Sequence, residues 1–243
     1  MSPPEGLASR NAILGSLPDA ELASLLPSLE LRRIALGMPL IEPGQPIEDV
    51  WFPLSGVASV VTESEDGTSV EVATIGRDGI VGADVFLGIW QIPQRVMCQV
   101  QGQALAGPAA EILAGPASAR LADAARKYVH TVMTQAAQGV LCNKMHPLEQ
   151  RAARWLLSVH DRLDADSFYL THDYFATMLG SHRPSVTIAA GMLREAGLIT
   201  YSRGDIRILD RPGLEAAACE CYSIVASDYA TTMNDAASQV WGA

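Results

Sequence analysis

Short apolar runs separated by turn-forming residues dominate the chain between Leu29 and Leu113. The clearest β-branched runs span residues 57–61, 70–75 and 95–100. Glu65-Asp66-Gly67 lies between the first two runs, and an Asp-Gly pair supplies the positive φ angles that tight hairpins require. Strands at this spacing predict a small antiparallel roll or barrel, with a short helix at 18–26 before it.

The pattern changes to helical spacing from Pro116 to about Met145, where apolar residues recur at steps of three and four. A helix of about 30 residues extends about 45 Å, farther than a small roll can cover. Part of its apolar stripe is therefore expected to meet a second copy of the chain, and the alternative is a core helix inside one subunit. His146-Pro147 ends the pattern and predicts a joint before a helix at 148–163, because proline lacks a backbone donor and restricts its predecessor.

Residues 171–198 predict a helix-turn-helix. Two short helices can cross steeply when the residue at the crossing is small, the turn residue tolerates a positive φ angle, and the flanking faces are apolar. Ala176 and Gly180 meet the first two conditions. The apolar flanks are Phe175, Leu179, Val186, Ala189 and Met192. The second helix is expected to begin around His182-Arg183-Pro184, since proline is well tolerated in the first turn of a helix.

The exposed face of this second helix carries the candidate DNA contacts. Arg183 can form a bidentate contact with guanine O6 and N7, and Ile188 can touch a thymine methyl group. Pro184 and Thr187 are expected on the same face. The side chains best suited to phosphate oxygens near a helix N-terminus are Thr171, His182 and Ser185.

Residues 198–209 predict two strands around Arg203-Gly204-Asp205, which makes a wing beside the two helices. Arg203 at the tip is a candidate contact to the DNA backbone, and the alternative is that Asp205 neutralises it. A last helix is expected at 213–240, packed against the body of the protein.

The order of roll, long helix, helix-turn-helix and wing resembles the Crp/Fnr family of transcription regulators over nearly the whole chain. Residues 179–187 and 193–199 are similar to the family's DNA-reading helix and its exit, and residues 52–56 and 75–82 resemble its sensor strands. The resemblance implies a sequence-specific DNA-binding regulator that acts as a homodimer on a palindromic operator, with half-sites about one helical turn apart. RNA polymerase and an unidentified small-molecule effector are further candidate partners.

The expected fold is α+β, with three parts. Residues 1–115 are expected to form an antiparallel, jelly-roll-like β-roll similar to cyclic-nucleotide-binding sensor domains. Residues 116–146 form the long dimerisation helix and hinge, and residues 147–243 form a winged helix-turn-helix domain with a C-terminal helical extension. The hinge near His146-Pro147 is the element that a sensor event is expected to bias.

The candidate effector pocket departs from the pattern of the family's cyclic-nucleotide binders. Those proteins use a Gly-Glu pair for the ribose and an Arg-Ser pair for the phosphate, whereas the matching positions here are Gly82-Ala83 and Arg95-Val96. The carboxylate and the hydroxyl are missing, so cyclic AMP is not the expected effector. The candidate pocket residues are Gly82, Ala83, Asp84, Arg95, Val96, Tyr128 and Val132.

The four cysteines are Cys98, Cys142, Cys219 and Cys221. They fit neither a paired CxxC zinc pattern nor a clustered iron–sulfur spacing, and are expected to be reduced thiols with a structural role. No metal and no cofactor is predicted. A thiol switch at Cys142, or at Cys219 and Cys221, is conceivable but disfavoured, because residues two apart on the expected helix point to nearly opposite faces.

Composition and charge bear on nucleic-acid binding, on the location of the protein and on the competing classes of function. A formal net charge of −10 argues against nucleic acid, but residues 146–211 carry equal numbers of acidic and basic side chains, so the acidic excess lies elsewhere. Absence of a long apolar run or a signal-like N-terminus predicts a cytoplasmic protein. The competing function is a small-molecule-binding module whose helix-turn-helix does not read DNA. An enzyme is not expected, since no nucleophile elbow, phosphate loop or paired carboxylates are found.

Overall fold

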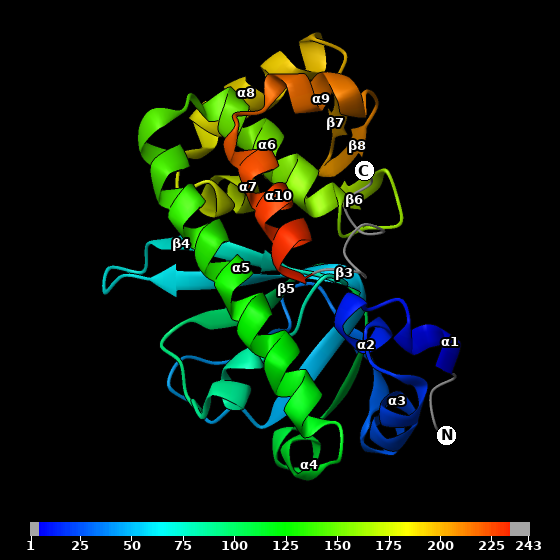
Figure 1. The fold of residues 1–243 in the computed structure, drawn as a ribbon. Coiled ribbons are helices and arrows are strands. Elements are labelled where there is room, and N and C mark those ends of the chain that lie inside the picture. Colours follow the sequence, from blue (N-terminus) through cyan, green and yellow to red (C-terminus); the bar gives the residue numbers. More distant parts are fainter. Residues whose placement is uncertain (1–4, 234–243) are drawn as a thin grey trace.

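The computed structural model describes residues 5–233, arranged as a β-roll, a long helix along its side and a mostly helical C-terminal part (Figure 1). The roll is preceded by the short helices α1 (Glu5–Ala8), α2 (Ala12–Gly15), α3 (Asp19–Leu25) and η1 (Leu26–Ser28). Only the third was expected, at 18–26. None of the described helices is long and apolar enough to cross a membrane.

The roll is an antiparallel sheet in the order β1-β5-β3-β4, with β2 added to β5. The strands are β1 (Glu30–Ile34), β2 (Pro39–Ile41), β3 (Asp49–Glu63), β4 (Ser69–Ile75) and β5 (Arg95–Pro108). The predicted hairpin joins β3 and β4, and Gly67 in its turn has a φ angle of 83°. Gly56 lies where the β3–β5 register shifts, at a φ angle of 79°, and a Cβ there would come within 2.4 Å of the Val100 carbonyl oxygen.

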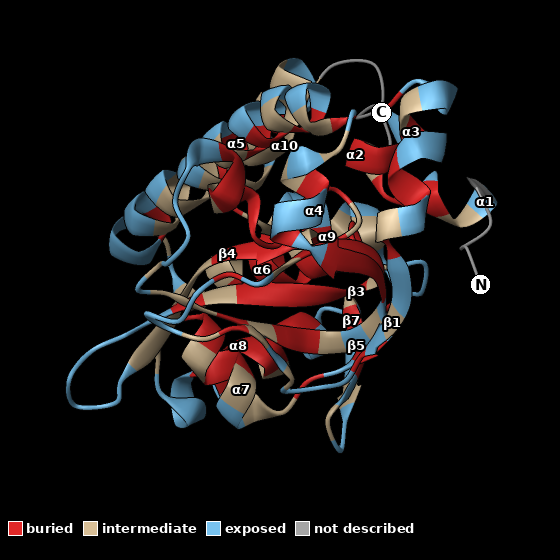
Figure 2. Cartoon of the chain, turned by 90° about the horizontal axis from the view of Figure 1, so that it is seen from below, coloured by how far each residue is buried: buried red, intermediate tan, exposed pale blue. Residues whose placement is uncertain are grey.

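β3 is buried along most of its length (Figure 2), because in its second half the two faces of the strand pack into different cores. Val50, Phe52 and Ala58 belong to the core of the roll, which also includes residues from the first half of the long helix. Val57 and Val61 instead belong to the core of the C-terminal part, beside Trp155. The roll and the C-terminal part are therefore packed together directly, and β3 is shared between them.

The long helix is α5 (Ser118–Met145), preceded by η2 (Ala83–Leu87) and α4 (Ala109–Ala114). Its buried stripe, with Leu121, Ala125 and Tyr128, faces the roll as the spacing predicted. His146 leaves the helix with an extended backbone at φ −108° and ψ 142°, and α6 (Leu148–His160) begins directly after Pro147. The joint predicted at His146-Pro147 is confirmed as a break between two helices.

The C-terminal part contains the predicted helix-turn-helix, α7 (His172–Met178) and α8 (Arg183–Glu195). Its wing is β7 (Ile199–Ser202) and β8 (Asp205–Ile208), and a third strand, β6 (Ser167–Tyr169), pairs with β8. The third strand was not predicted. It is only three residues long with a single buried side chain, Phe168, so it carries too little alternation to be recognised.

The single helix expected at 213–240 is wrong. The structure has α9 (Arg211–Ala217) and α10 (Cys221–Met233), with an extended break at Ala218 (φ −77°, ψ 160°), and residues 234–240 lie outside the described range. α10 turns back and runs along α5, as Figure 1 shows, and Tyr229 reaches the roll, where its hydroxyl donates to the Asp78 carbonyl oxygen at 2.6 Å.

Candidate nucleic-acid interface

Local hydrogen bonds and packing set the angle between α7 and α8. The Thr171 hydroxyl oxygen accepts from the Tyr174 backbone amide and caps α7. Gly180 adopts a φ angle of 53°, and the Ser181 amide donates to the Ala176 carbonyl oxygen at 2.9 Å. Ala176 is buried at the crossing, so the small residue and the glycine turn have the roles that the sequence predicted.

The two faces of α8 differ sharply. Val186, Ala189 and Leu193 are buried in the C-terminal core, whereas the opposite face is open to solvent. The exposed residues include six of the eight predicted contacts on this motif: His182, Arg183, Pro184, Ser185, Thr187 and Ile188. Ile188 exposes 66% of its surface, so its side chain is accessible to a partner on this face.

Arg183 stands at the first turn of α8, with its guanidinium 3.3 Å from the Asp173 carboxylate. Both side chains are more than 60% exposed, so the pair holds the guanidinium without removing it from solvent. Thr187, one turn later, donates to the Arg183 carbonyl oxygen at 2.9 Å and lies 3.2 Å from His172 Nδ1. Arg183 is thus free to exchange Asp173 for another acceptor.

The wing turns through Arg203 and Gly204, whose φ angles of 52° and 89° correspond to a two-residue hairpin turn. The Arg203 side chain is exposed at the tip, while Gly204 lies under the ring of Tyr169. The Gly204 carbonyl oxygen accepts from the Leu170 amide at 2.7 Å, which ties the wing to the strand β6 that the sequence did not reveal.

A groove of about 400 Å³ separates α8 from the wing, and three arginines line it: Arg183, Arg194 and Arg203. Arg194 was missed by the sequence reasoning. It follows Arg183 by three helical turns and therefore lies on the same face of α8, a spacing that could have identified it. Two aromatic rings, Tyr169 and Tyr201, line the same groove.

The candidate effector residues are distributed over the core and one edge of the roll. Ala83, Val96 and Tyr128 are buried members of its hydrophobic core, and Val132 packs against that core. Gly82 caps η2 with a left-handed backbone, and burial raises the pKa of Asp84 beside it. Arg95 is engaged by two carboxylates, Glu42 at 2.8 Å and Glu63 at 3.5 Å.

A short helix, a glycine turn, a second helix with an exposed arginine at its start, and a β-wing define a winged helix-turn-helix domain, the class of domain that inserts a helix into the DNA major groove. Residues 150–217 match the family model of the Crp-like helix-turn-helix domain. No curated protein matches the chain.

Solved structures extend the likeness to the whole fold. FixK2 from Bradyrhizobium japonicum superimposes with a TM-score of 0.66 at 15% identity, covering 79% of this chain and 98% of FixK2. A putative Crp/Fnr-family transcriptional regulator from Eubacterium rectale superimposes with a TM-score of 0.63 at 20% identity, covering 86% of this chain and 98% of that protein. The c-di-GMP responsive global regulator CLP of Xanthomonas campestris superimposes with a TM-score of 0.63 at 14% identity, covering 79% of this chain and 100% of CLP. Residues 150–217 therefore form a Crp-like helix-turn-helix domain, and the chain as a whole has the fold of these Crp/Fnr-type structures.

Proposed function

We propose that two copies of the chain associate through α5 and place their two α8 helices in successive major grooves of a palindromic operator. The observation that carries this proposal is the open face of α8, where Arg183 stands exposed at the helix start and shares a groove with Arg194 and Arg203. Helix-turn-helix proteins read base edges with the N-terminal residues of the second helix.

Each predicted contact then has a role that follows from its position. Arg183 reads guanine, and Ile188 meets a thymine methyl group. His182, Ser185 and Thr171 bind phosphate oxygens near the helix N-terminus, where backbone amides favour anions. Pro184 and Thr187 pack against the groove wall, and Arg203 on the wing reaches the DNA backbone, with Arg194 as an additional phosphate contact.

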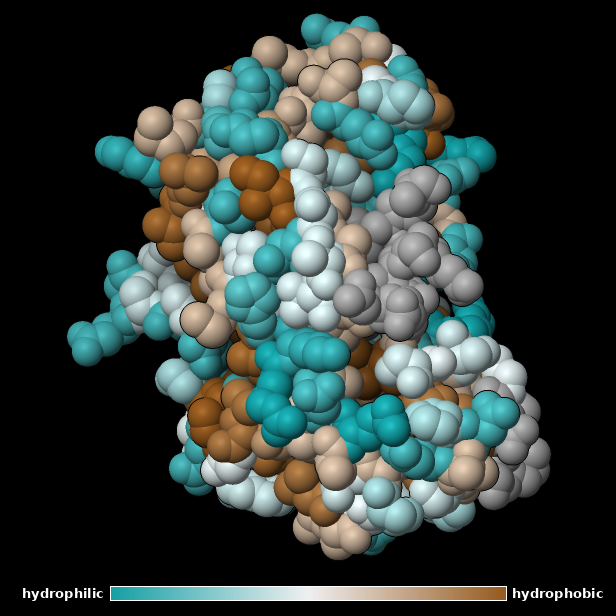
Figure 3. Space-filling model, viewed as in Figure 1, coloured by the Kyte–Doolittle hydropathy of each residue, from teal (hydrophilic) through white to brown (hydrophobic). Residues whose placement is uncertain are grey.

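Apolar side chains on the open face of α5 support dimerisation. Met133, Val140, Leu141 and Met145 expose 66%, 74%, 43% and 65% of their surface, and hydrophobic patches are visible over the upper part of this helix in Figure 3. An apolar stripe of this kind on one subunit is typical of a surface that a partner covers. The occupant that the symmetry of an operator requires is a second α5.

The sensor roll has no assigned effector in this proposal. Arg95, the side chain suited to a phosphate, is already engaged by Glu42 and Glu63, which supports an effector other than a cyclic nucleotide. RNA polymerase contacts and action in the bacterial cytoplasm follow from the role of a transcription regulator, and no catalytic step is part of it.

Selection of bound sequences from a random DNA pool provides the operator on which the proposal is tested. Arg183→Ala is expected to cost about 1 to 3 kcal/mol on that operator and little on random DNA, because a base contact is lost. Arg33→Ala removes the same charge from an exposed position of β1 and should leave both affinities unchanged. Equal losses of Arg183→Ala on both DNAs contradict base reading.

Salt dependence separates the proposed regulator from a small-molecule-binding module. Contacts to phosphates release counterions, so the operator affinity should fall steeply as salt is raised. DNA retention that is absent, or insensitive to salt, in gel-shift titrations of the wild-type chain contradicts the regulator and favours the module.

A further inference from the structure

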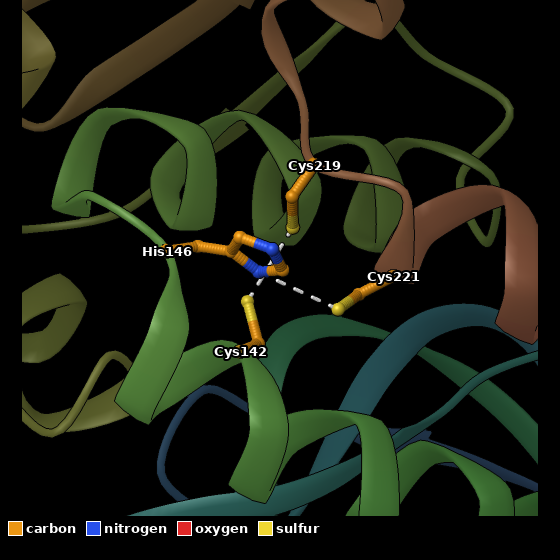
Figure 4. Close-up of side chains that lie close together, drawn as sticks. All are labelled: Cys142, His146, Cys219 and Cys221. Carbon is orange, nitrogen blue, oxygen red and sulfur yellow. Dashed lines mark hydrogen bonds between the residues drawn. The ribbon is translucent and has the colours of Figure 1, made fainter.

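Four side chains that commonly bind metals meet where α5 ends, and Figure 4 shows them pointing toward one another. They are Cys142, His146, Cys219 and Cys221, and one ligand atom from each lies within 4.8 Å of the other three. Cys142 is in the last turn of α5, and His146 follows that helix directly. Cys221 is the first residue of α10, and Cys219 lies two residues before it.

The separations between these atoms are close to those of a tetrahedral metal site. Ligand atoms about 2.0 to 2.3 Å from a zinc ion lie about 3.7 Å from one another at the corners of a tetrahedron. The Sγ atoms of Cys142 and Cys219 are 3.5 Å apart, and Cys221 Sγ is 3.6 Å from His146 Nδ1. An ion at the centre therefore requires only small side-chain adjustments.

The chemistry of the donor set selects the metal. Three sulfurs and one imidazole nitrogen in tetrahedral arrangement are typical of structural zinc sites, whereas calcium and magnesium bind oxygen ligands. All three sulfurs are buried, and the His146 side chain is 13% exposed, so the donor set is closed and offers no open coordination position.

Groups around the four ligands complete the features expected of such a site. His146 Nε2 lies 3.2 Å from a Glu220 carboxylate oxygen, which favours a proton on Nε2 and leaves Nδ1 unprotonated toward the sulfurs. Arg154 brings a positive charge close to the Cys142 sulfur.

We propose that Cys142, His146, Cys219 and Cys221 bind one Zn²⁺ ion per chain. Three thiolates, a neutral imidazole and the ion sum to a charge of −1, which Arg154 at the cluster balances. The ion joins the end of α5, the first residue of the hinge and the α9–α10 connection. Bound zinc therefore holds the C-terminal part in a fixed orientation on α5.

The argument against a thiol switch assumed an unbroken last helix, in which Cys219 and Cys221 would face opposite ways. The break at Ala218 removes that constraint and lets both sulfurs face Cys142.

Metal content of the full chain is the first test. Untagged protein, prepared under reducing conditions and without chelator, is expected to contain one zinc per chain. The metal-free protein is expected to bind Co²⁺ with the thiolate charge-transfer and visible bands of a tetrahedral site. Cys98→Ser is the matched control, because Cys98 lies on β5 outside the cluster, and it should bind like the wild type. Cys142→Ser and Cys219→Ser should lose tight binding.

Two further measurements keep the test independent of misfolding in the cysteine variants. Glu220→Gln changes an exposed side chain that does not touch the metal, and it should weaken zinc affinity by about tenfold or more. In the wild type, a chelator should lower the unfolding temperature and added zinc should restore it, whereas the chelator should leave Cys219→Ser unchanged.

Substoichiometric zinc, a Co²⁺ spectrum without thiolate bands, or a Cys142–Cys219 disulfide in the protein prepared under reducing conditions would overturn the proposal. The effect of zinc on operator affinity rests on the proposed function and is measured separately. Zinc bound with unchanged DNA affinity supports the site and contradicts only its coupling to DNA. Failure of DNA binding in zinc-loaded protein contradicts the proposed function and leaves the metal site standing.

Discussion

Glu71 is a half-buried residue whose carboxyl group lies between the roll and the C-terminal part. The Trp155 indole N–H donates to one of its oxygens at 2.7 Å, and the Ser59 hydroxyl lies 2.5 Å from the other. Burial raises the pKa of Glu71 to about 7, although the hydrogen bonds from Ser59 and Trp155 and the charges of Arg154 and Arg162 act in the opposite direction. Desolvation is therefore the dominant influence on this group.

Ser59 has one hydroxyl hydrogen but two acceptors within reach, Glu71 at 2.5 Å and Gln99 Oε1 at 2.6 Å. A protonated Glu71 resolves this competition, because its own hydrogen can be shared with Ser59 while the Ser59 hydroxyl donates to Gln99. The geometry and the raised pKa thus agree on a neutral acid below about pH 7.

Stability should depend on this proton. The folded-state pKa lies above the ordinary value of 4.5, so the folded protein binds more protons than the unfolded chain between pH 4.5 and about 7. The proton on Glu71 therefore contributes up to about 3 kcal/mol to the free energy of unfolding. This contribution is fully present below pH 4.5 and is lost as the pH rises through 7. Glu71→Gln should lack this loss, so that its unfolding free energy relative to wild type rises with pH. Urea denaturation across this range measures the difference, and a difference independent of pH contradicts a neutral Glu71.

At the scale of elements, Asp78 connects the roll to the end of α6 and to α10. It lies between β4 and η2, and its carboxylate is 2.7 Å from Arg162 just after α6, with both side chains almost fully buried. Its other carboxylate oxygen accepts from the Gly76 amide, and its carbonyl oxygen accepts from Tyr229 of α10. Arg162 in turn donates to the Ser158 carbonyl oxygen at 2.6 Å.

Asp78→Ala should therefore destabilise the fold by about 3 to 5 kcal/mol, because removal of one partner leaves the other charge buried without its carboxylate. Asp164→Ala is the matched control. Asp164 is 46% exposed and pairs with Arg10 and Arg77, and exposed pairs contribute about 1 kcal/mol or less. Chemical denaturation of both variants measures the two losses, and equal losses contradict a special role for the buried pair.

Elements with a local signal could be predicted from the sequence, and elements defined by distant contacts could not. The helix-turn-helix depends on the spacing of Ala176, Gly180 and Val186 within one segment, so its residues alone indicate it. The break at Ala218 has neither glycine nor proline to mark it, and the surrounding residues favour a helix. Burial of Cys219 and Cys221 against the end of α5 overrides that preference, and this contact spans more than 70 residues of chain.

The difference between local signals and distant contacts also explains which residues of the candidate interface could be predicted from the sequence. Arg183 and Arg203 stand next to turn signals, whereas Arg194 is recognised only once the register of α8 is fixed. Contacts between the roll and the C-terminal part, such as Glu71 with Trp155, have no local signature at all. Local pattern therefore specifies the helix-turn-helix, and tertiary packing specifies how it is attached to the roll.

On the scale of the whole molecule, the proposed dimerisation through α5 determines whether two α8 helices can reach one operator. Val140 is the most exposed large apolar side chain on this helix, at 74%, and Met133 and Met145 flank it at 66% and 65%. α10 covers another part of α5 within the same chain, so the open stripe is the surface left for a partner.

Val140→Glu should weaken the dimer by about 100-fold, because a carboxylate buried in an apolar interface costs several kcal/mol when it has no partner. Leu36→Glu makes the same replacement at an exposed apolar position of the roll and should leave the dimer intact. Sedimentation over a range of protein concentrations measures both. Since one operator engages both subunits, Val140→Glu should also lose operator affinity while retaining the fold of each chain. A Val140→Glu protein that dimerises like the wild type contradicts α5 as the interface, and the half-site spacing would then have to be set by another surface.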